Sequence, residues 1–372
     1  MSSVSVSDKK ITEETFKQFL LAHGGPFYEL QRQLGLLHEH ALHAGWRALL
    51  VVGLCWGVPL LLTLSSATAY GSAASGPYLL DPIAWARFFI AVSVFILMER
   101  QIEKQLNRYL LQFVRAPLIA PESFQAAANA VSRALRRRDT FIAEAVCLII
   151  AYLISIVFLY GHLLDQDASN WSVQITSESH SLTPAGWWVI IISNPIYVFL
   201  MLRWFWRMIV WGLLLRELAR LKLRLVATHP DGNGGLAFIS QYPNAYSMFV
   251  FAISCVLGAT VANALMNNEM TTTTYGFIMP GWLGLVLMVF ALPLLAFNKP
   301  LRTLKDQTLL AYDALATRHN RTKEHETIGR NIMADSDERA DTSEQCSDPA
   351  KEYALTQKLS TLLFSRTTLL PL

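Results

Sequence analysis

Six long apolar stretches limit what this chain can fold into more than any other feature. A helix needs about 20 apolar residues to cross the hydrocarbon core of a bilayer, and each stretch is about that long. Composition agrees, because 53% of the 372 residues are hydrophobic and only 16% are charged, whereas about 25% are charged in a typical soluble domain. We therefore expect an all-α, polytopic membrane helix bundle. Its six predicted transmembrane helices are residues 48–66, 80–98, 142–162, 186–206, 246–266 and 277–298.

The distribution of Lys and Arg predicts the orientation of this bundle. No Lys or Arg occurs in the segments after the first, third and fifth spans, which are residues 67–80, 164–186 and 267–276. Of the 31 basic residues, 29 lie in the other four segments, which are residues 1–46, 99–141, 203–245 and 299–372. Cytoplasmic segments of membrane proteins are rich in Lys and Arg. The pattern therefore predicts that both termini are cytoplasmic (N-in/C-in).

The spans also divide the chain into three parts. Residues 1–46 are expected to form an amphipathic cytoplasmic lead-in, residues 47–298 the six-helix transmembrane domain, and residues 299–372 a cytoplasmic tail. Helical patterning beyond spans two and four predicts helical cytoplasmic extensions, whereas the polar stretch 319–350 is expected to be a linker. The last residues, TTLLPL, look like the start of a further apolar helix. We therefore expect the tail to be truncated.

Arg87 is the most conspicuous ionisable residue, because it falls inside the second span. A charge at that depth costs about 2.5–3.5 kcal/mol on insertion scales. One interpretation is that Arg87 lines a solute pathway or binds an anionic ligand. The alternative is that the span begins near Ala84, so that Arg87 reaches the outer head groups or Asp81. The residue types alone do not decide between these interpretations.

Spans three and four carry further candidates. Glu144 near the start of span three could form an ion pair with Arg203 or Arg207 at the inner end of span four, and such a pair would act as a structural clamp. Asn194 and Pro195 lie in the middle of span four, where proline frees a backbone carbonyl and kinks the helix. Broken helices often line transport sites, but proline kinks also occur in ordinary membrane helices.

The loop before span five has the most distinctive local sequence, His229-Pro-Asp-Gly-Asn-Gly-Gly-Leu236. His229 and Asp231 supply an imidazole and a carboxylate, while Gly234 and Gly235 permit positive φ and expose backbone N–H groups. The spacing fits neither a calcium-binding loop nor a phosphate-binding P-loop. The simpler interpretation is a tight turn in which Asp231 caps the next helix.

No catalytic residues, metal site or cofactor site are predicted. None of the six spans has a central Asp or Glu, and His38, His40 and His43 lack a fixed metal-binding motif. The net charge of +3 does not indicate a nucleic-acid partner. The expected partners are membrane lipids, including anionic ones, and a second copy of the chain or another membrane complex.

Several segments resemble a family of bacterial polytopic inner-membrane proteins that share a His-Pro-Asp-x-x-Gly-Gly-Leu motif. These segments are GGPFYELQRQLGLL, DPIAWARFFIAV, SLTPAGWW, NPIYVFLMLRWFWR, LRLVATHPDGNGGLAF and AYDALATRH. The resemblance implies a location in the bacterial inner membrane, but it does not imply an activity.

Two functional hypotheses follow from these features. The first is a channel or transporter for a small or anionic solute, with Arg87 in the pathway and the loop from His229 to Gly235 at its cytoplasmic mouth. The alternative is a non-catalytic scaffold or accessory subunit that binds a partner complex or anionic lipid.

Overall fold

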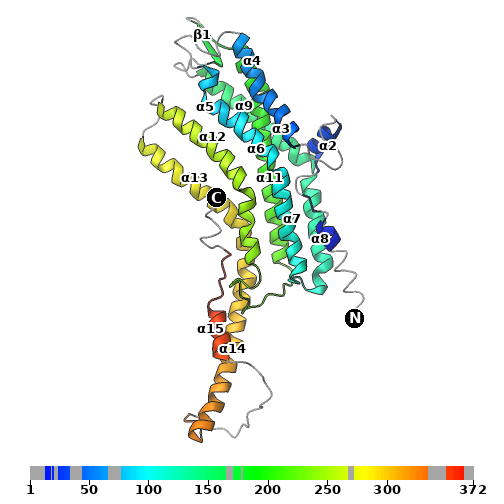
Figure 1. Ribbon diagram of the computed structural model, residues 1–372, viewed down its shortest axis with the longest axis vertical. Helices are drawn as coiled ribbons and strands as arrows, with labels where there is room; N and C mark the ends of the chain where they lie inside the picture. The colour runs from blue at the N-terminus through cyan, green and yellow to red at the C-terminus, as the bar shows by residue number, and fades with distance from the viewer. Residues whose placement is uncertain are drawn as a thin grey trace.

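The protein is a helical bundle with a long helical projection at one end (Figure 1). The computed structural model describes residues 13–17, 19–20, 24–33, 44–65, 77–164, 171–176, 179–266, 272–333 and 349–363. The α-helices are α2 Pro26–Gln33, α3 Ala44–Val52, α4 Val58–Ser65, α5 Pro82–Ala84, α6 Val92–Leu97, α7 Glu99–Arg115, α8 Phe124–Arg138, α9 Phe141–Leu164, α10 Pro184–Trp188, α11 Asn194–Ala219, α12 Ser247–Met266, α13 Thr272–Leu294, α14 Asn298–Ile328 and α15 Pro349–Gln357.

In the part of the chain that the structure describes, short segments of different pitch interrupt these helices. Three of them are π-helical: η1 Gly53–Gly57, η3 Trp85–Ala91 and η5 Val189–Ser193. Four are 3₁₀ helices: η2 Tyr78–Leu80, η4 Pro121–Ser123, η6 Ala237–Tyr246 and η7 Leu295–Phe297. The π-helical segments lie within spans one, two and four, so three of the first four spans depart from α-helical geometry at a comparable depth.

Within the described residues, six helices are long and apolar enough to cross a membrane, as the sequence predicted. They are Ala44–Ser65, Pro82–Arg115, Pro121–Leu159, Pro184–Ala219, Ala237–Met266 and Tyr275–Ile328. Their outward faces are apolar: Ile149 and Val157 of α9 and Phe277 and Leu283 of α13 are all more than half exposed. Apolar faces of this extent mark contact with membrane, so the chain is a multi-pass integral membrane protein.

Several spans continue well beyond the bilayer thickness. Span two runs on as α7, and span six runs through η7 into α14, which begins at Asn298 and ends at Ile328. The expectation of a linker from residue 319 is therefore wrong for residues 319–328, which are helical. The sequence there is polar and charge-mixed, but it contains no Gly or Pro before Gly329, where φ of +81° ends the helix. Residues 334–348 and the terminal TTLLPL lie outside the described part of the chain.

The two ends of the bundle are chemically different. One end carries an antiparallel hairpin of β1 Val173–Thr176 and β2 Ser179–Leu182, paired Val173 with Leu182, and we call it the hairpin end. The opposite end, called the basic end, holds α7, α8 and the last turns of α11 (Figure 1). The hairpin lies in the segment 164–186, which contains no Lys or Arg, and the bundle is otherwise helical, as the all-α prediction expected.

Candidate functional site

Spans one to four carry two polar layers, and the layer nearer the hairpin end is built on the π-helical segments. η1 contacts both η3 and η5, and α11 contacts η3. The widened turns of a π-helix leave backbone carbonyls available to side-chain donors. In η1, Trp56 O accepts a hydrogen bond from Tyr78 Oη at 3.1 Å, and Leu54 O accepts one from Trp188 Nε1 at 3.0 Å. The irregular backbone is therefore held by aromatic side chains.

Arg87 projects from η3 toward spans three and four. Its Cζ lies 5.3 Å from the centroid of the Phe158 ring in α9, and it is close enough to Tyr197 of α11 and to Asp81 to interact electrostatically with both. Within the described part of the chain, Arg87 makes no hydrogen bond or ion pair, and its Nε is buried. Nε is the one guanidinium nitrogen of Arg87 that is both buried and without a partner, and the residue as a whole is partly buried.

The expected alternative partner of Arg87, Asp81, is already engaged. Its Oδ1 caps the start of α5 by accepting hydrogen bonds from the backbone N–H of Ile83 and Ala84 at 2.8 and 3.3 Å. Its Oδ2 accepts a hydrogen bond from Trp171 Nε1 at 2.9 Å. Asp81 therefore anchors span two to the hairpin, and it forms no ion pair with Arg87.

Other polar groups in this layer come from the neighbouring segments. Ser193 of η5 is fully buried, and its Oγ has no hydrogen-bond partner among the described residues. Nε1 of Trp56 in η1 is also buried and also has no hydrogen-bond partner among them. Asn194 Nδ2 donates a hydrogen bond to Ser155 Oγ across α9 and α11 at 3.0 Å. We call Trp56, Arg87, Ser155, Ser193 and Asn194 the π-segment cluster.

Pro195 explains the break in span four. It occupies the first turn of α11, directly after η5. Proline cannot donate a backbone hydrogen bond and its ring crowds the preceding turn, so the α-helical pattern of span four restarts at Asn194 instead of running through. The proline therefore shapes the segment that carries Ser193 and Asn194.

The second polar layer lies toward the basic end and centres on Glu99. Its carboxylate contacts three arginines: Arg47 Nη1 at 3.0 Å, Arg207 Nη1 at 3.4 Å and Arg203 Nη1 at 3.5 Å. All four side chains are at most 6% exposed. Glu103, one turn further along α7, is also buried and interacts electrostatically with Arg207. The layer ties α3, α7 and α11 together.

Glu144 extends this layer to α9 and to the lead-in. Arg203 Nε lies 3.1 Å from Glu144 Oε1, which is the ion pair expected from the sequence, whereas Arg207 pairs with Glu99 instead. The other oxygen of Glu144 accepts a hydrogen bond from the backbone N–H of Phe27 at 2.7 Å. The Phe27 ring also lies 4.9 Å from Arg203 Cζ. We call Arg47, Glu99, Glu103, Glu144, Arg203 and Arg207 the charge network.

Sequence reasoning missed Arg47, Glu99 and Glu103. Arg47 and Glu99 fell just outside the predicted ends of spans one and two, where charges normally meet water. A weak signal existed, because Glu99 and Glu103 are four residues apart, as are Arg203 and Arg207, and such pairs share one helix face.

The lead-in can approach Glu144 this closely because Gly25 has no side chain. Gly25 has φ of +91°, and a Cβ there would lie 2.6 Å from Glu144 Oε1. We expect Gly25→Ala to destabilise the protein by about 1–3 kcal/mol, because it adds backbone strain and displaces a buried carboxylate. Gly45→Ala is the control, since a Cβ there meets nothing within 4 Å. Equal melting temperatures of the two variants in detergent would contradict this role of Gly25.

The loop from His229 to Leu236 forms a compact turn held by Asp231. Asp231 Oδ1 accepts hydrogen bonds from the backbone N–H of Asn233 at 2.9 Å and of Gly235 at 3.0 Å, and Oδ2 accepts one from Ala237 at 3.0 Å. His229 Nδ1 lies 2.8 Å from Asp231 Oδ1, while the imidazole is 44% exposed. This geometry matches the expected capping turn, with the cap on η6 instead of on an α-helix.

Gly234 and Gly235 both have positive φ, +67° and +95°. A Cβ on Gly234 would lie 3.2 Å from Leu301 of α14, and one on Gly235 would lie 3.1 Å from Leu118. Both glycines are buried and allow the loop to pack closely, and the backbone N–H of Gly235 is already donated to Asp231. These contacts support the interpretation of the loop as a tight turn.

Asp231 should make stability depend on pH. Burial raises the pKa of Asp231, but hydrogen bonds from Asn233, Ala237 and Gly235 and the contact with His229 outweigh burial and lower the pKa below its usual value. The folded state therefore gains stability above the unfolded pKa of about 3.9 and loses it as pH falls through the lower folded value.

We expect Asp231→Asn to lower the melting temperature at neutral pH, corresponding to about 1–3 kcal/mol for the lost hydrogen bonds. The difference in melting temperature between Asp231→Asn and wild type should become smaller in acid, where Asp231 of the wild type is protonated. Asp306→Asn is the control, because Asp306 is 65% exposed and 3.9 Å from Arg302. A pH-independent gap for Asp231→Asn would contradict this prediction.

Comparisons with protein families, curated proteins and solved structures found no match to this chain. The resemblance to a family of bacterial inner-membrane proteins, drawn from six segments of the sequence, therefore stays a prediction. Among the described residues, no group of three or more His, Cys, Asp or Glu side chains could hold a metal ion. His38, His40 and His43 lie outside the described residues.

Proposed function

We propose that the protein transports a small monovalent anion and that Arg87 is the group that binds it. The observation that carries the proposal is the buried Nε of Arg87 in an apolar bundle, without a hydrogen bond or ion pair among the described residues. Burying an unpaired charge is costly, and the usual compensation is an opposite charge. A single guanidinium compensates a single negative charge, which favours a monovalent ligand over a divalent one.

The surroundings of Arg87 support this proposal. Discontinuous or irregular helices often surround substrate sites in transporters, and π-helical segments are common at functional sites. Ser193 Oγ and Trp56 Nε1 are further buried donors without partners in the described chain. A desolvated anion needs several donors, so the π-segment cluster has the chemistry for an anion site.

In this proposal the charge network closes the route from Arg87 to the basic end. It spans the same four transmembrane helices as the π-segment cluster, and its arginines and glutamates are mutually paired. An anion at Arg87 would have to separate part of this network to leave in that direction. In our proposal the basic end faces the cytoplasm, because Lys and Arg concentrate on that side of bacterial inner-membrane proteins.

Anion efflux from proteoliposomes tests the proposed function. The purified full chain is reconstituted into liposomes loaded with the potassium salt of chloride, nitrate, formate or sulfate, and valinomycin lets potassium follow the anion. We expect faster efflux of at least one monovalent anion than from protein-free liposomes, and no acceleration for sulfate. Efflux at the protein-free rate for every monovalent anion would remove the proposal.

A membrane scaffold or accessory subunit is the second candidate. It is favoured by a row of exposed basic residues on α7, Arg100, Lys104 and Arg108, which repeat every four residues. None of them forms an ion pair within the described part of the chain. Such a row suits an acidic partner or anionic head groups. Co-purification of a stoichiometric partner that is lost on Arg100→Gln/Lys104→Gln/Arg108→Gln would favour this candidate.

A further inference from the structure

A large pocket lies outside both polar layers, between the second half of α11 and the helix formed by α13, η7 and α14. Its volume is about 1270 Å³, and η6 contributes Tyr242 and Tyr246 to its wall. Tyr242 Oη donates a hydrogen bond to Phe290 O at 2.7 Å, which holds η6 against α13. Toward the hairpin end, α13 diverges from α11 (Figure 1).

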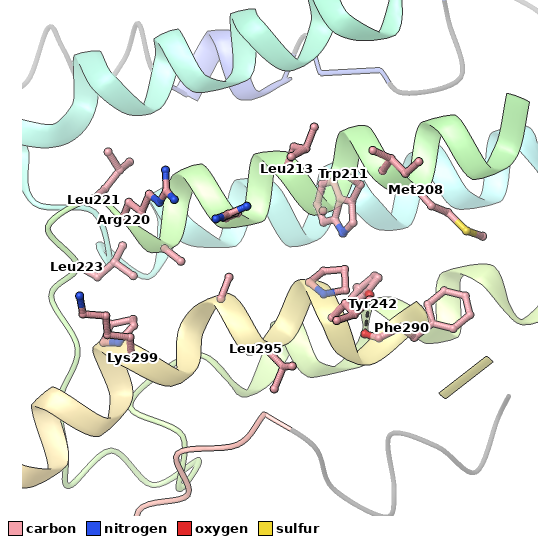
Figure 2. Close-up of a pocket in the computed structure, with 18 of the residues that line it drawn as sticks. Met208, Trp211, Leu213, Arg220, Leu221, Leu223, Tyr242, Phe290, Leu295 and Lys299 are labelled. Carbon is pink, nitrogen blue, oxygen red and sulfur yellow. Dashed lines mark hydrogen bonds between the residues drawn. The ribbon is translucent and has the colours of Figure 1, made fainter. Parts of the chain in front are cut away.

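The two ends of the pocket differ in chemistry. Figure 2 shows Met208 and Phe290 at one end and Arg220 and Lys299 at the other. A third cation, Arg216, lies one helical turn before Arg220 and also lines the pocket. The pocket is therefore amphipathic along its length.

The cations of this pocket have no protein counter-charge. Arg216, Arg220 and Lys299 are exposed, and none forms an ion pair within the described part of the chain. No Asp or Glu is among the residues lining the pocket, all of which the structure describes. By contrast, Arg133 and Arg137 on α8 both pair with Glu217 of α11 at 2.7 Å. Glu217, the carboxylate next to Arg216 in the sequence, is therefore engaged by α8, and Arg216 and Arg220 on the pocket side have no ion-pair partner among the described residues.

The α13 side of the pocket places it at the edge of the bilayer. Phe290 lies within the predicted sixth span, 277–298, and Lys299 directly follows that span. The two residues are nine positions apart, which corresponds to about 14 Å along a helix, and half of a hydrocarbon core about 30 Å thick is about 15 Å. The cations therefore lie where head groups would be, and the apolar end of the pocket lies toward the bilayer centre. A lipid in that leaflet would enter with its head group beside the cations.

We propose that this pocket binds an anionic phospholipid of the leaflet at the basic end. Its phosphate contacts Arg216, Arg220 and Lys299, and an acyl chain lies along Met208 and Phe290. The occupant is a lipid and not a free anion, because the larger part of the pocket wall is apolar. The site shares no residue with the π-segment cluster, so it stands whether or not the protein transports an anion.

Native mass spectrometry of the delipidated full chain in detergent tests this site. Phosphatidylglycerol and phosphatidylcholine with identical acyl chains are titrated separately, and the dissociation constants of the first bound lipid are compared. We expect phosphatidylglycerol to bind at least about tenfold more tightly, since each well-placed cation favours an anionic lipid. Equal affinities would overturn the proposal.

Matched variants locate the binding. Arg216→Gln/Arg220→Gln/Lys299→Gln should abolish the preference for phosphatidylglycerol, whereas the α7 variant Arg100→Gln/Lys104→Gln/Arg108→Gln should keep it. Equal loss of preference in both variants would assign the effect to general surface charge and overturn the site. Ile209→Trp, at a 52% exposed position in the pocket wall, should weaken both lipids while leaving the cations in place.

Inorganic phosphate separates a head-group site from a lipid site. If phosphate alone displaces phosphatidylglycerol at comparable concentration, the pocket binds free anions and the lipid proposal fails. Unchanged melting temperatures of the variants would show that the losses come from the site and not from unfolding.

Discussion

Glu99→Gln is expected to destabilise the protein by about 3–5 kcal/mol, the usual cost of removing one partner from a buried ion pair. Glu99 is the carboxylate shared by Arg47, Arg203 and Arg207, at distances of 3.0 to 3.5 Å. A neutral amide would leave these three guanidinium groups close together with only Glu103 and Glu144 to balance them. Because all of these side chains are buried, water cannot replace the missing charge.

Thermal unfolding in detergent, followed by the loss of the monodisperse peak in size-exclusion chromatography, measures this effect. Glu122→Gln is the matched control, since Glu122 lies 3.0 Å from Lys222 but the two side chains are 61% and 74% exposed. An exposed pair of this kind contributes about 0–1 kcal/mol. If Glu99→Gln and Glu122→Gln unfold at the same temperature, the charge network does not stabilise the bundle.

The spans could be predicted because their signal is local. Apolar length alone marks a transmembrane helix, and each predicted span overlaps one observed helix. Arg87 and Glu144 could also be identified as candidates, because a charge within an apolar stretch needs an explanation wherever the neighbouring helices lie. Local sequence was less informative for the hairpin, whose two strands have four residues each and few apolar side chains.

The partners of the charges could be predicted only in part, because they depend on how the helices are rotated and tilted. Glu99 pairs with Arg47 across 52 positions of the chain and with Arg207 across 108, and no periodicity within one helix reveals such a contact. The lipid pocket is lined by α11, η6 and the helix of α13, η7 and α14, and no local sequence pattern reveals that these segments meet. The engagement of Asp81 with Trp171 likewise became evident only in three dimensions.

Removing a charge is expected to affect stability differently in the charge network and at Arg87. In the network the carboxylates are buried beside arginines, so a buried carboxylate or arginine stabilises the fold only while its oppositely charged partner is present. Arg87 has a cation–π contact with Phe158 and a longer-range interaction with Asp81, but it forms no hydrogen bond or ion pair with a described residue. Substitutions that remove charge should therefore change stability in opposite directions at the two sites.

Arg87→Gln is expected to reduce anion efflux by about tenfold or more, because a hydrogen bond to a charged ligand contributes about 1.5–3 kcal/mol. The half-saturating anion concentration should rise if Arg87 binds the solute. Arg87→Lys should retain part of the transport, since it keeps the charge but loses the planar fork of donors. Arg100→Gln on the exposed face of α7 should leave efflux unchanged.

The same Arg87→Gln variant should be at least as stable as wild type when no transported anion is present, because it removes a partly buried charge that forms no hydrogen bond or ion pair with a described residue. Functional sites often sacrifice stability in this way. The transported anion should in turn raise the melting temperature of wild type, since it binds only the folded state, and should not raise that of Arg87→Gln. A variant that is both less stable and inactive would instead show that Arg87 has a structural role, and the anion site would have to be abandoned.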